Sequence, residues 1–176
     1  MEWVGLLHIY SLKNDLWQET KIVASDGVSG DEFGTSVAIS GDGNTVIAGA
    51  PYNDAGGNSA GAAYIYKVKN NNWIEDVKLF NDGPDTRLGF SVAISGNGRT
   101  SLIGGDASGH GSAYIYSLFN DQWQATELHP SDGSQGDGYG RSVAISSGAD
   151  RLIIGAPANS DNGYWSGSTY MYTLKN

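Results

Sequence analysis

The chain contains no cysteine among its 176 residues and only four prolines. The absence of cysteine excludes disulfide scaffolds, zinc–thiolate centres and cysteine nucleophiles. No apolar stretch approaches the ~18 residues that a transmembrane helix needs. Residues 1–12 lack the basic segment and the cleavage site of a signal peptide. We therefore expect no membrane insertion, and a fold that is stabilised by its own core.

Basic residues are also few, with 10 Lys and Arg against 19 Asp and Glu and a net charge of −9. An acidic surface repels phosphate backbones, so nucleic acid is not expected to be a partner. No segment shows apolar residues at i, i+3, i+4 and i+7, which predicts a protein without helices. A hydrophobic content of 39% nevertheless predicts a folded domain rather than a disordered chain.

Glycine is abundant, with 26 residues, roughly twice the usual share of about 7%. The glycines belong to a repeat with a period of about 54 residues. Its best-matched segments are SVAISGDGNTVIAGAP from Ser36, SVAISGNGRTSLIGGD from Ser91 and SVAISSGADRLIIGAP from Ser142. A tyrosine segment (AYIYKV, AYIYSL, TYMYTL), a tryptophan segment and a glycine-rich link follow in order. Internal repetition at this period predicts stacked copies of one structural unit.

Each unit reads as four strands, because short runs of Val, Ile, Tyr and Trp alternate with Gly, Asn and Asp clusters. The first run, SVAIS, is the smallest and most apolar, and the fourth is the most polar. This grading predicts an all-β protein made of β-propeller blades, each with four antiparallel strands, a buried inner strand and a solvent-facing outer strand. A β-solenoid is the main rival, although its coils are usually much shorter. The aromatic side chains expected between the sheets are Tyr64, Tyr114, Tyr170, Trp17, Trp73 and Trp123.

The chain opens and closes on a tyrosine segment, which is the third strand of a unit. It should therefore hold about thirteen strands, or about three blades plus one extra strand. We expect a single domain, 1–176, that divides into a partial blade (1–30), two blades (31–84 and 85–135) and a partial blade (136–176). Such a chain is either a partial propeller or one that is completed by assembly.

Two short motifs flank the first two strands of each unit. Phe33-Gly34 precedes Gly49-Ala50-Pro51, and Tyr139-Gly140 precedes Gly155-Ala156-Pro157. The second unit matches only in part, with Leu88-Gly89 and Gly104-Gly105-Asp106. This pattern resembles the FG-GAP repeat family, found in the propellers of integrin α-subunits and in bacterial extracellular proteins. The resemblance implies a β-propeller that works outside the cell or at its surface.

Integrin-type repeats often carry a calcium loop between strands one and two. Here that link is only Gly41-Asp42-Gly43-Asn44, whereas calcium takes 6–8 oxygen ligands. We therefore expect no cofactor, since the short hairpin does not support calcium. If a metal binds, the candidates are four carboxylates of the glycine-rich links, namely Asp26, Asp31, Asp132 and Asp137. The alternative is that these carboxylates hold tight turns by accepting backbone N–H bonds.

The loops between the second and third strands differ most among the units, and variable loops on a repeated scaffold often carry recognition. They combine aromatic, amide and carboxylate groups, as sugar-binding sites do. The candidate ligand-binding residues are Tyr52, Asn53, Asp54, His110, Asp161, Asn162, Tyr164 and Trp165. Ordinary solvated turns are the alternative reading of the same loops.

No set of acid, base and nucleophile is readable in the sequence, so we expect no enzyme and no catalytic residue. The predicted function is non-catalytic recognition or adhesion, in which the loops of a propeller bind a protein or glycan. The alternative is a structural unit that self-associates by pairing its exposed terminal strands. The molecular mass in solution would discriminate between the two.

Overall fold

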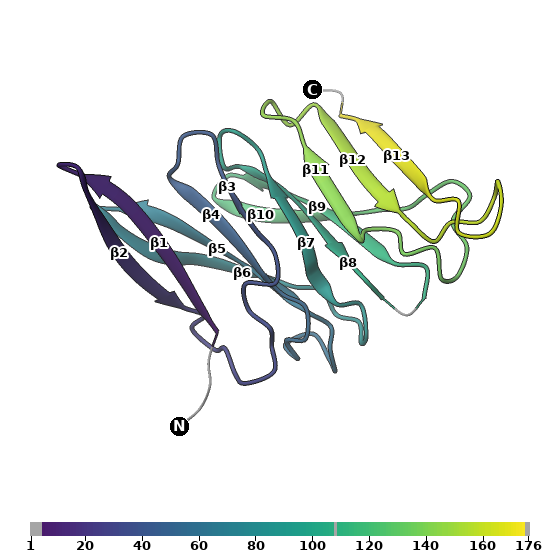
Figure 1. Cartoon of the computed structure of the whole chain (residues 1–176), viewed down its shortest axis with the longest axis horizontal. Helices are drawn as coiled ribbons and strands as arrows, with labels where there is room; N and C mark the ends of the chain where they lie inside the picture. The colour runs from purple at the N-terminus through teal and green to yellow at the C-terminus, as the bar shows by residue number, and fades with distance from the viewer. Residues whose placement is uncertain (1–4, 108, 175–176) are drawn as a thin grey trace.

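The computed structural model describes residues 5–107 and 109–174 (Figure 1). Within these ranges every regular element is a β-strand, and none is a helix that could cross a membrane. The strands are β1 (Leu6–Lys13), β2 (Leu16–Val23), β3 (Val37–Ile39), β4 (Thr45–Ala50), β5 (Ala62–Lys69), β6 (Asn72–Leu79), β7 (Leu88–Ile94), β8 (Thr100–Gly105), β9 (Ser112–Phe119), β10 (Gln122–Leu128), β11 (Ser142–Ile145), β12 (Arg151–Ala156) and β13 (Ser168–Thr173). The all-β prediction is confirmed.

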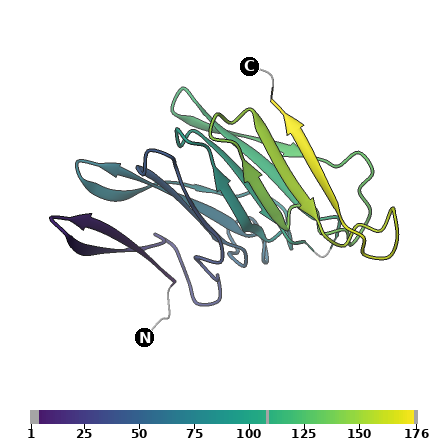
Figure 2. The same ribbon diagram turned by 45° about the horizontal axis from the view of Figure 1, so that its top comes forward.

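The strands form four antiparallel sheets, each connected in sequence order. We call them blade I (β1–β2), blade II (β3–β6), blade III (β7–β10) and blade IV (β11–β13). The complete sheets have four strands, and the chain opens and closes on third strands, as the sequence pattern predicted. The blades stand side by side in chain order in both views (Figures 1 and 2). Because the inner strand β7 touches both β3 and β11, the inner strands lie next to one another, as in a propeller.

The connections separate to opposite ends of the sheets, as sequence-ordered antiparallel strands require. Tight turns join the first strand to the second and the third to the fourth at one end (Figure 1). At the other end lie the second-to-third loops 51–61, 106–111 and 157–167 with the links between blades, 24–36, 80–87 and 129–141. We call this end the loop face.

The short turns that replace a calcium loop are held by their own side chains. Asp42 accepts bonds from the Ser40 hydroxyl at 2.5 Å and from the Asn44 N–H at 3.0 Å. Asn97 repeats both bonds in blade III, and Asp150 repeats the serine contact in blade IV. The hydroxyl contact and the Asn44 N–H lower the pKa of Asp42. The carboxylate thus serves the hairpin itself.

The deepest burial is in the second strand of each complete blade rather than in the first. All six residues of β4 are buried, whereas Val37 and Ile39 of β3 are 56% and 59% exposed. The prediction of a buried inner strand is therefore wrong for β3. The second strand is covered by strands on both sides and by the neighbouring blade. The first strand faces the propeller axis, where the described chain places nothing opposite it.

Tyrosines connect each blade to the preceding one in a repeated way. The hydroxyls of Tyr66, Tyr116 and Tyr172 donate to the carbonyls of Val23, Phe80 and His129 at 3.4, 3.2 and 2.8 Å. Each acceptor is the last residue of the preceding blade's outermost strand or the residue directly after it. This contact recurs at all three blade boundaries, so it explains why the second tyrosine of the segment repeats with the period.

The aromatic residues expected between sheets are buried to different degrees. Tyr64 is fully buried, and Tyr114, Tyr170, Trp73 and Trp123 are half-buried. Trp17 is 69% exposed, so its predicted burial is wrong. Trp73 packs against the same buried cluster as Leu7 and Ile22 of the preceding blade. The described chain has no blade on the corresponding side of β2, which leaves the Trp17 ring in solvent.

A glycine contact joins neighbouring blades close to the axis. A Cβ atom on Gly49 of blade II would overlap the carbonyl oxygen of Gly89 of blade III. The Ser36 hydroxyl donates to the same carbonyl at 2.7 Å. Between blades III and IV, Gly104, Ser91 and Gly140 repeat this arrangement. The glycines of the FG and GAP motifs therefore meet across blade boundaries as well as within one blade, where the Gly34 N–H donates to the Gly49 carbonyl at 2.8 Å.

We expect Gly49→Ala to destabilise the protein by about 1–3 kcal/mol, because the added methyl forces blades II and III apart. Gly104→Ala should do the same between blades III and IV. Gly148→Ala is the matched control, since its Cβ would meet only ordinary van der Waals neighbours. Urea unfolding measures all three variants. Equal stability of Gly49→Ala and Gly148→Ala would contradict the proposed role of the glycine contact.

Candidate functional site

The loop face holds a buried carboxylate–amide pair in blade II. The Asn53 amide donates to the Asp31 carboxylate at 2.8 Å, and both residues are 4% exposed. The Val28 N–H also donates to Asp31, and the Ala55 N–H donates to the Asn53 side-chain oxygen. Link and loop are thereby tied together. Asn53, a predicted ligand-binding residue, is buried and engaged in this contact, so we assign it a structural role.

Blade IV repeats the pair with Asp137 and Asn159. The Asn159 amide donates to Asp137 at 3.1 Å, and the Ser134 N–H donates to the same oxygen at 2.8 Å. In the intervening copy the sequence has Thr86 in place of this aspartate and a serine in place of the asparagine. In each copy the aspartate and the asparagine are therefore either both present or both replaced. This is expected if the two residues serve a single shared contact.

The other two link carboxylates bind tyrosines. The Tyr64 hydroxyl donates to Asp26 at 2.7 Å, and the Tyr170 hydroxyl donates to Asp132 at 2.7 Å. Burial followed by the bond to Asp132 raises the pKa of Tyr170 to about 12. Partial burial works to raise the pKa of Asp26, but the Lys78 ammonium at 2.6 Å and the Tyr64 hydroxyl outweigh it and lower that pKa. Asp26 is thus an anion held by two donors.

The four aspartates named as metal candidates therefore all have protein partners. Within the described ranges no three His, Asp or Glu side chains converge on a point where they could hold a metal. Asp31 and Asp137 accept backbone N–H bonds within their links, as the alternative interpretation predicts. Asp26 and Asp132 instead accept bonds from tyrosine hydroxyls of the third strands.

The most exposed candidate residues lie in loop 157–167. Tyr164 is 86% exposed and Trp165 is 66% exposed. Their rings stack with centroids 5.4 Å apart and an interplanar angle of 16°. Trp165 has a φ of 53°, in the left-handed region that bulky residues rarely adopt. Asp161 and Asn162, also exposed, belong to the same loop.

A second group of candidates lines a hollow of about 390 Å³ between link 24–36 and loop 51–61. Tyr52 and Asp54 contribute from the loop and Glu32 from the link. The Arg87 guanidinium of the next link lies 5.4 Å from the centre of the Tyr52 ring. The structure thus places these predicted residues in a small acidic depression on the loop face.

The remaining candidate, His110, lines a separate hollow beside His129 and Tyr139. The sequence does not indicate that His129 is its neighbour, because the two histidines lie on different connections. Their spacing in the chain carries no signal, and only the stacking of loop 106–111 on link 129–141 brings them together.

A model of the FG-GAP repeat matches residues 17–66 and 123–172, more than half of the chain. The chain belongs to the FG-GAP repeat family. Each matched FG-GAP segment begins in an outer strand and ends in the third strand of the next blade. The unmatched middle contains the copy with Leu88-Gly89 and Gly104-Gly105-Asp106, which departs most from the motif.

Among solved structures, the FG-GAP chain is similar to the hydrazine synthase of Kuenenia stuttgartiensis, with a TM-score of 0.52 and 13% identity. The match covers 78% of this chain and 33% of that one, so this chain spans about a third of that protein's length. Similarity at this identity shows the fold alone. No curated protein matched this chain.

Removal of the buried Asn53 amide should break the contact between link 24–36 and loop 51–61. We expect Asn53→Ala to cost about 3 kcal/mol of unfolding free energy, because it leaves the buried Asp31 carboxylate short of a donor. The double variant Asp31→Ala/Asn53→Ala should cost less than the sum of the single variants. Asn58→Ala, exposed in the same loop, is the control. Strictly additive effects in urea unfolding would show that the two side chains do not act as a pair.

Proposed function

We propose that this FG-GAP chain is a non-catalytic recognition module that binds a protein or carbohydrate through its loop face. The observation that carries the proposal is the exposed stack of Tyr164 and Trp165. Large aromatic side chains are enriched at binding hot spots because they supply rigid apolar area and polar edges. A location outside the cell or at its surface accords with what is typical of the family.

The equivalent loop of blade II supports the proposal, because it has the same backbone conformation without the two aromatic rings. Asn58 and Ser59 stand in place of Tyr164 and Trp165, and Ser59 shares the left-handed backbone with a φ of 48°. The same loop geometry thus forms with small polar side chains, so the fold does not require the aromatic rings. Asp161 and Asn162 beside the stack add the polar groups that a glycan or protein ligand would engage.

The double variant Tyr164→Ala/Trp165→Ala tests the proposal. The protein is screened on a glycan array and on immobilised collagen, fibronectin and laminin. We expect at least one ligand, with binding at least tenfold weaker in the variant, or about 1.4 kcal/mol. Trp17→Ala removes an equally exposed tryptophan away from the loop face and should bind as the unaltered chain does. Equal binding by the double variant, or no ligand on any surface, would contradict the proposal.

A second candidate function is self-association. It is favoured by a serine and a glycine on blade IV that, among the described residues, lack the carbonyl which the equivalent residues of blades II and III receive from the following blade. In the described ranges, Ser142 and Gly155, the counterparts of Ser36 and Gly49, receive no carbonyl from a following blade. They line a hollow of about 470 Å³ instead. Gly34 has a φ of +92°, nearly the same as the +93° of Gly89 and of Gly140, whose carbonyls make the glycine contact in the other blades. Blade I has only the third and fourth strands, β1 and β2, in the part of the chain that the structure describes, so it offers no inner strand to the Gly34 carbonyl. Blade IV of a second copy could receive this carbonyl instead.

Multi-angle light scattering of the 176-residue chain tests this second candidate. We expect a discrete oligomer that Ser142→Tyr reduces to a monomer, because the ring fills the hollow. Thr126→Tyr adds the same ring at an exposed site on β10 and should leave the mass unchanged. A monomer at every concentration would rule out self-association through this contact.

A further inference from the structure

The outward face of blade I repeats the side chains by which blade II holds its predecessor. Tyr10 pairs in register with Glu19, as Tyr66 pairs with Glu75 in blade II, and each tyrosine hydroxyl donates to its glutamate, at 2.9 and 3.3 Å. Leu7 packs against blade II, so the alternation of side chains along β1 directs Tyr10 the other way. Tyr10 is 58% exposed, whereas Tyr66 is fully buried. The β1–β2 hairpin thus has the side chains that cover a preceding blade, which the described residues do not supply.

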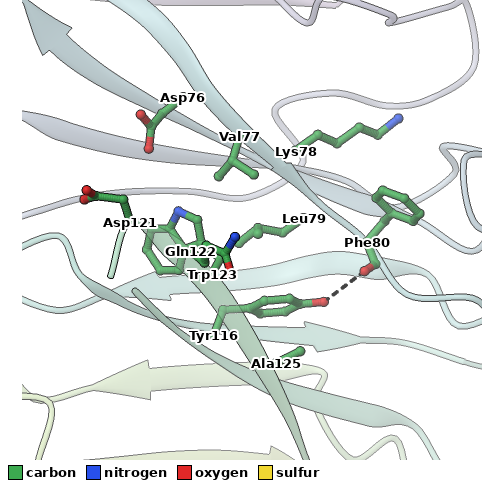
Figure 3. Close-up of a pocket in the computed structure, with 10 residues that line it drawn as sticks. All are labelled: Asp76, Val77, Lys78, Leu79, Phe80, Tyr116, Asp121, Gln122, Trp123 and Ala125. Carbon is green, nitrogen blue, oxygen red and sulfur yellow. Dashed lines mark hydrogen bonds between the residues drawn. The ribbon is translucent and has the colours of Figure 1, made fainter. Parts of the chain in front are cut away.

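Glu75 shows what such a glutamate binds. It accepts bonds from the N–H and the hydroxyl of Ser25, in the link that follows blade I, at 2.9 and 2.7 Å. Between blades II and III both members change. Ala125 stands in place of the glutamate, as Figure 3 shows beside Tyr116, and Asn81 stands before the Asp-Gly pair of the link in place of the serine. The glutamate and the serine are therefore replaced together, as expected of one contact.

The serine recurs in the link that follows blade III. Ser131 precedes Asp132-Gly133, as Ser25 precedes Asp26-Gly27. Both aspartates accept a bond from a tyrosine hydroxyl, so the two links have the same acceptors. In the described ranges blade IV has three strands, and no fourth strand there brings a glutamate to Ser131. Ser131 is thus a serine without its glutamate, and Glu19 is a glutamate without its serine.

A second pair of unmatched surfaces lies nearer the axis. Ile39 of β3 is 59% exposed, although its counterpart Ile94 packs at the boundary between blades II and III and is 8% exposed. Ile47 of β4 belongs to the cluster that covers Ile94. Its counterpart on blade IV, Ile153, is 40% exposed and has no following blade within the described ranges. An uncovered first strand on blade II therefore matches an unused second strand on blade IV.

We propose that a second copy of this chain completes blade I, with its strands β11 and β12 lying beside β1. The inference rests on the self-association considered above and specifies its contacts. Among the described strands β1 pairs with β2 alone, so its inner edge exposes unpaired N–H and C=O groups that a strand can bind. In the composite blade, Ile153 of the second copy covers Ile39. Glu19 faces Ser131 of the second copy, and Tyr10 faces the carbonyl of its His129.

Strand β13 of the second copy occupies the place that β1 takes, so it leaves β12 when the hairpin binds. None of the six residues of β13 is buried, whereas five of the eight residues of β5 are. The Tyr172 hydroxyl donates to the His129 carbonyl, so Tyr10 replaces one tyrosine bond with another. The hairpin also supplies the fourth strand, and it places the exposed Trp17 where Trp73 is half-buried in blade II.

The arrangement closes with two copies. Each copy keeps blades II and III, and each of the two chain boundaries adds one composite blade, which makes six blades in all. Six lies within the range of about four to eight blades that closed propellers use. Three copies would make nine blades, beyond that range.

Crosslinking of the full chain tests the arrangement, because the natural sequence has no cysteine. Glu19→Cys and Ser131→Cys proteins are mixed and treated with a short bismaleimide. We expect a band at twice the 18.5 kDa of one copy on a denaturing gel. Glu19→Cys mixed with Asn58→Cys, exposed on blade II, is the control and should give single chains. Ser25→Cys/Glu75→Cys should crosslink within one chain, which shows that the reagent spans this contact.

Light scattering of Ile153→Asp is the second measurement. Its charge enters the apolar contact with Ile39, so dimerisation should weaken at least tenfold. Ile74→Asp is the matched control, since Ile74 is 38% exposed on β6, outside the composite blade. A monomeric unaltered chain would overturn self-association as a whole. A dimer that shows no crosslink between positions 19 and 131, or that Ile153→Asp leaves intact, would overturn only the composite blade.

Discussion

Close approach of backbone at the blade boundary is the constraint on which the rest of this structure depends. The carbonyl of Gly89 occupies space that any side chain at position 49 would take, and the Ser36 hydroxyl fixes it there. This approach sets the distance between sheets near the axis. The tyrosine hydroxyls that reach the preceding blade's outer strand then set it near the edge. Two contacts, one at each end of a blade, thus define how neighbouring sheets stack.

The loop face follows from the same stacking. Each link must pass from the outer edge of one blade to the inner strand of the next, across the second-to-third loops. Its backbone N–H groups donate to loop carbonyls, as the Arg87 N–H does to the Ser59 carbonyl. The buried Asp31–Asn53 contact holds link to loop within blade II. Exposed side chains such as Tyr164 therefore project from a surface whose backbone is held from both sides.

The repeat period and the polar–apolar pattern were sufficient to predict the strands, their grouping into blades and the phase of the chain. The side-chain contacts between blades could not be predicted from the repeat period or from the polar–apolar pattern. Nothing local to Asn53 indicates burial, because the link that covers it lies about twenty residues earlier in the chain. The exposure of Val37 and Trp17 depends on which blades surround them.

The glycine contact is directional: the carbonyl always comes from the later blade, and the serine and glycine that receive it belong to the earlier one. Loss of order in a blade removes the carbonyl from the serine and glycine of its predecessor, and it also removes the carbonyl that accepts the tyrosine hydroxyl of its successor. Each boundary is therefore one interface that two blades share and lose together. Nearest-neighbour coupling of this kind makes the chain a one-dimensional cooperative system, in which blade I or blade IV can open at the cost of one interface and blade II or blade III only at the cost of two.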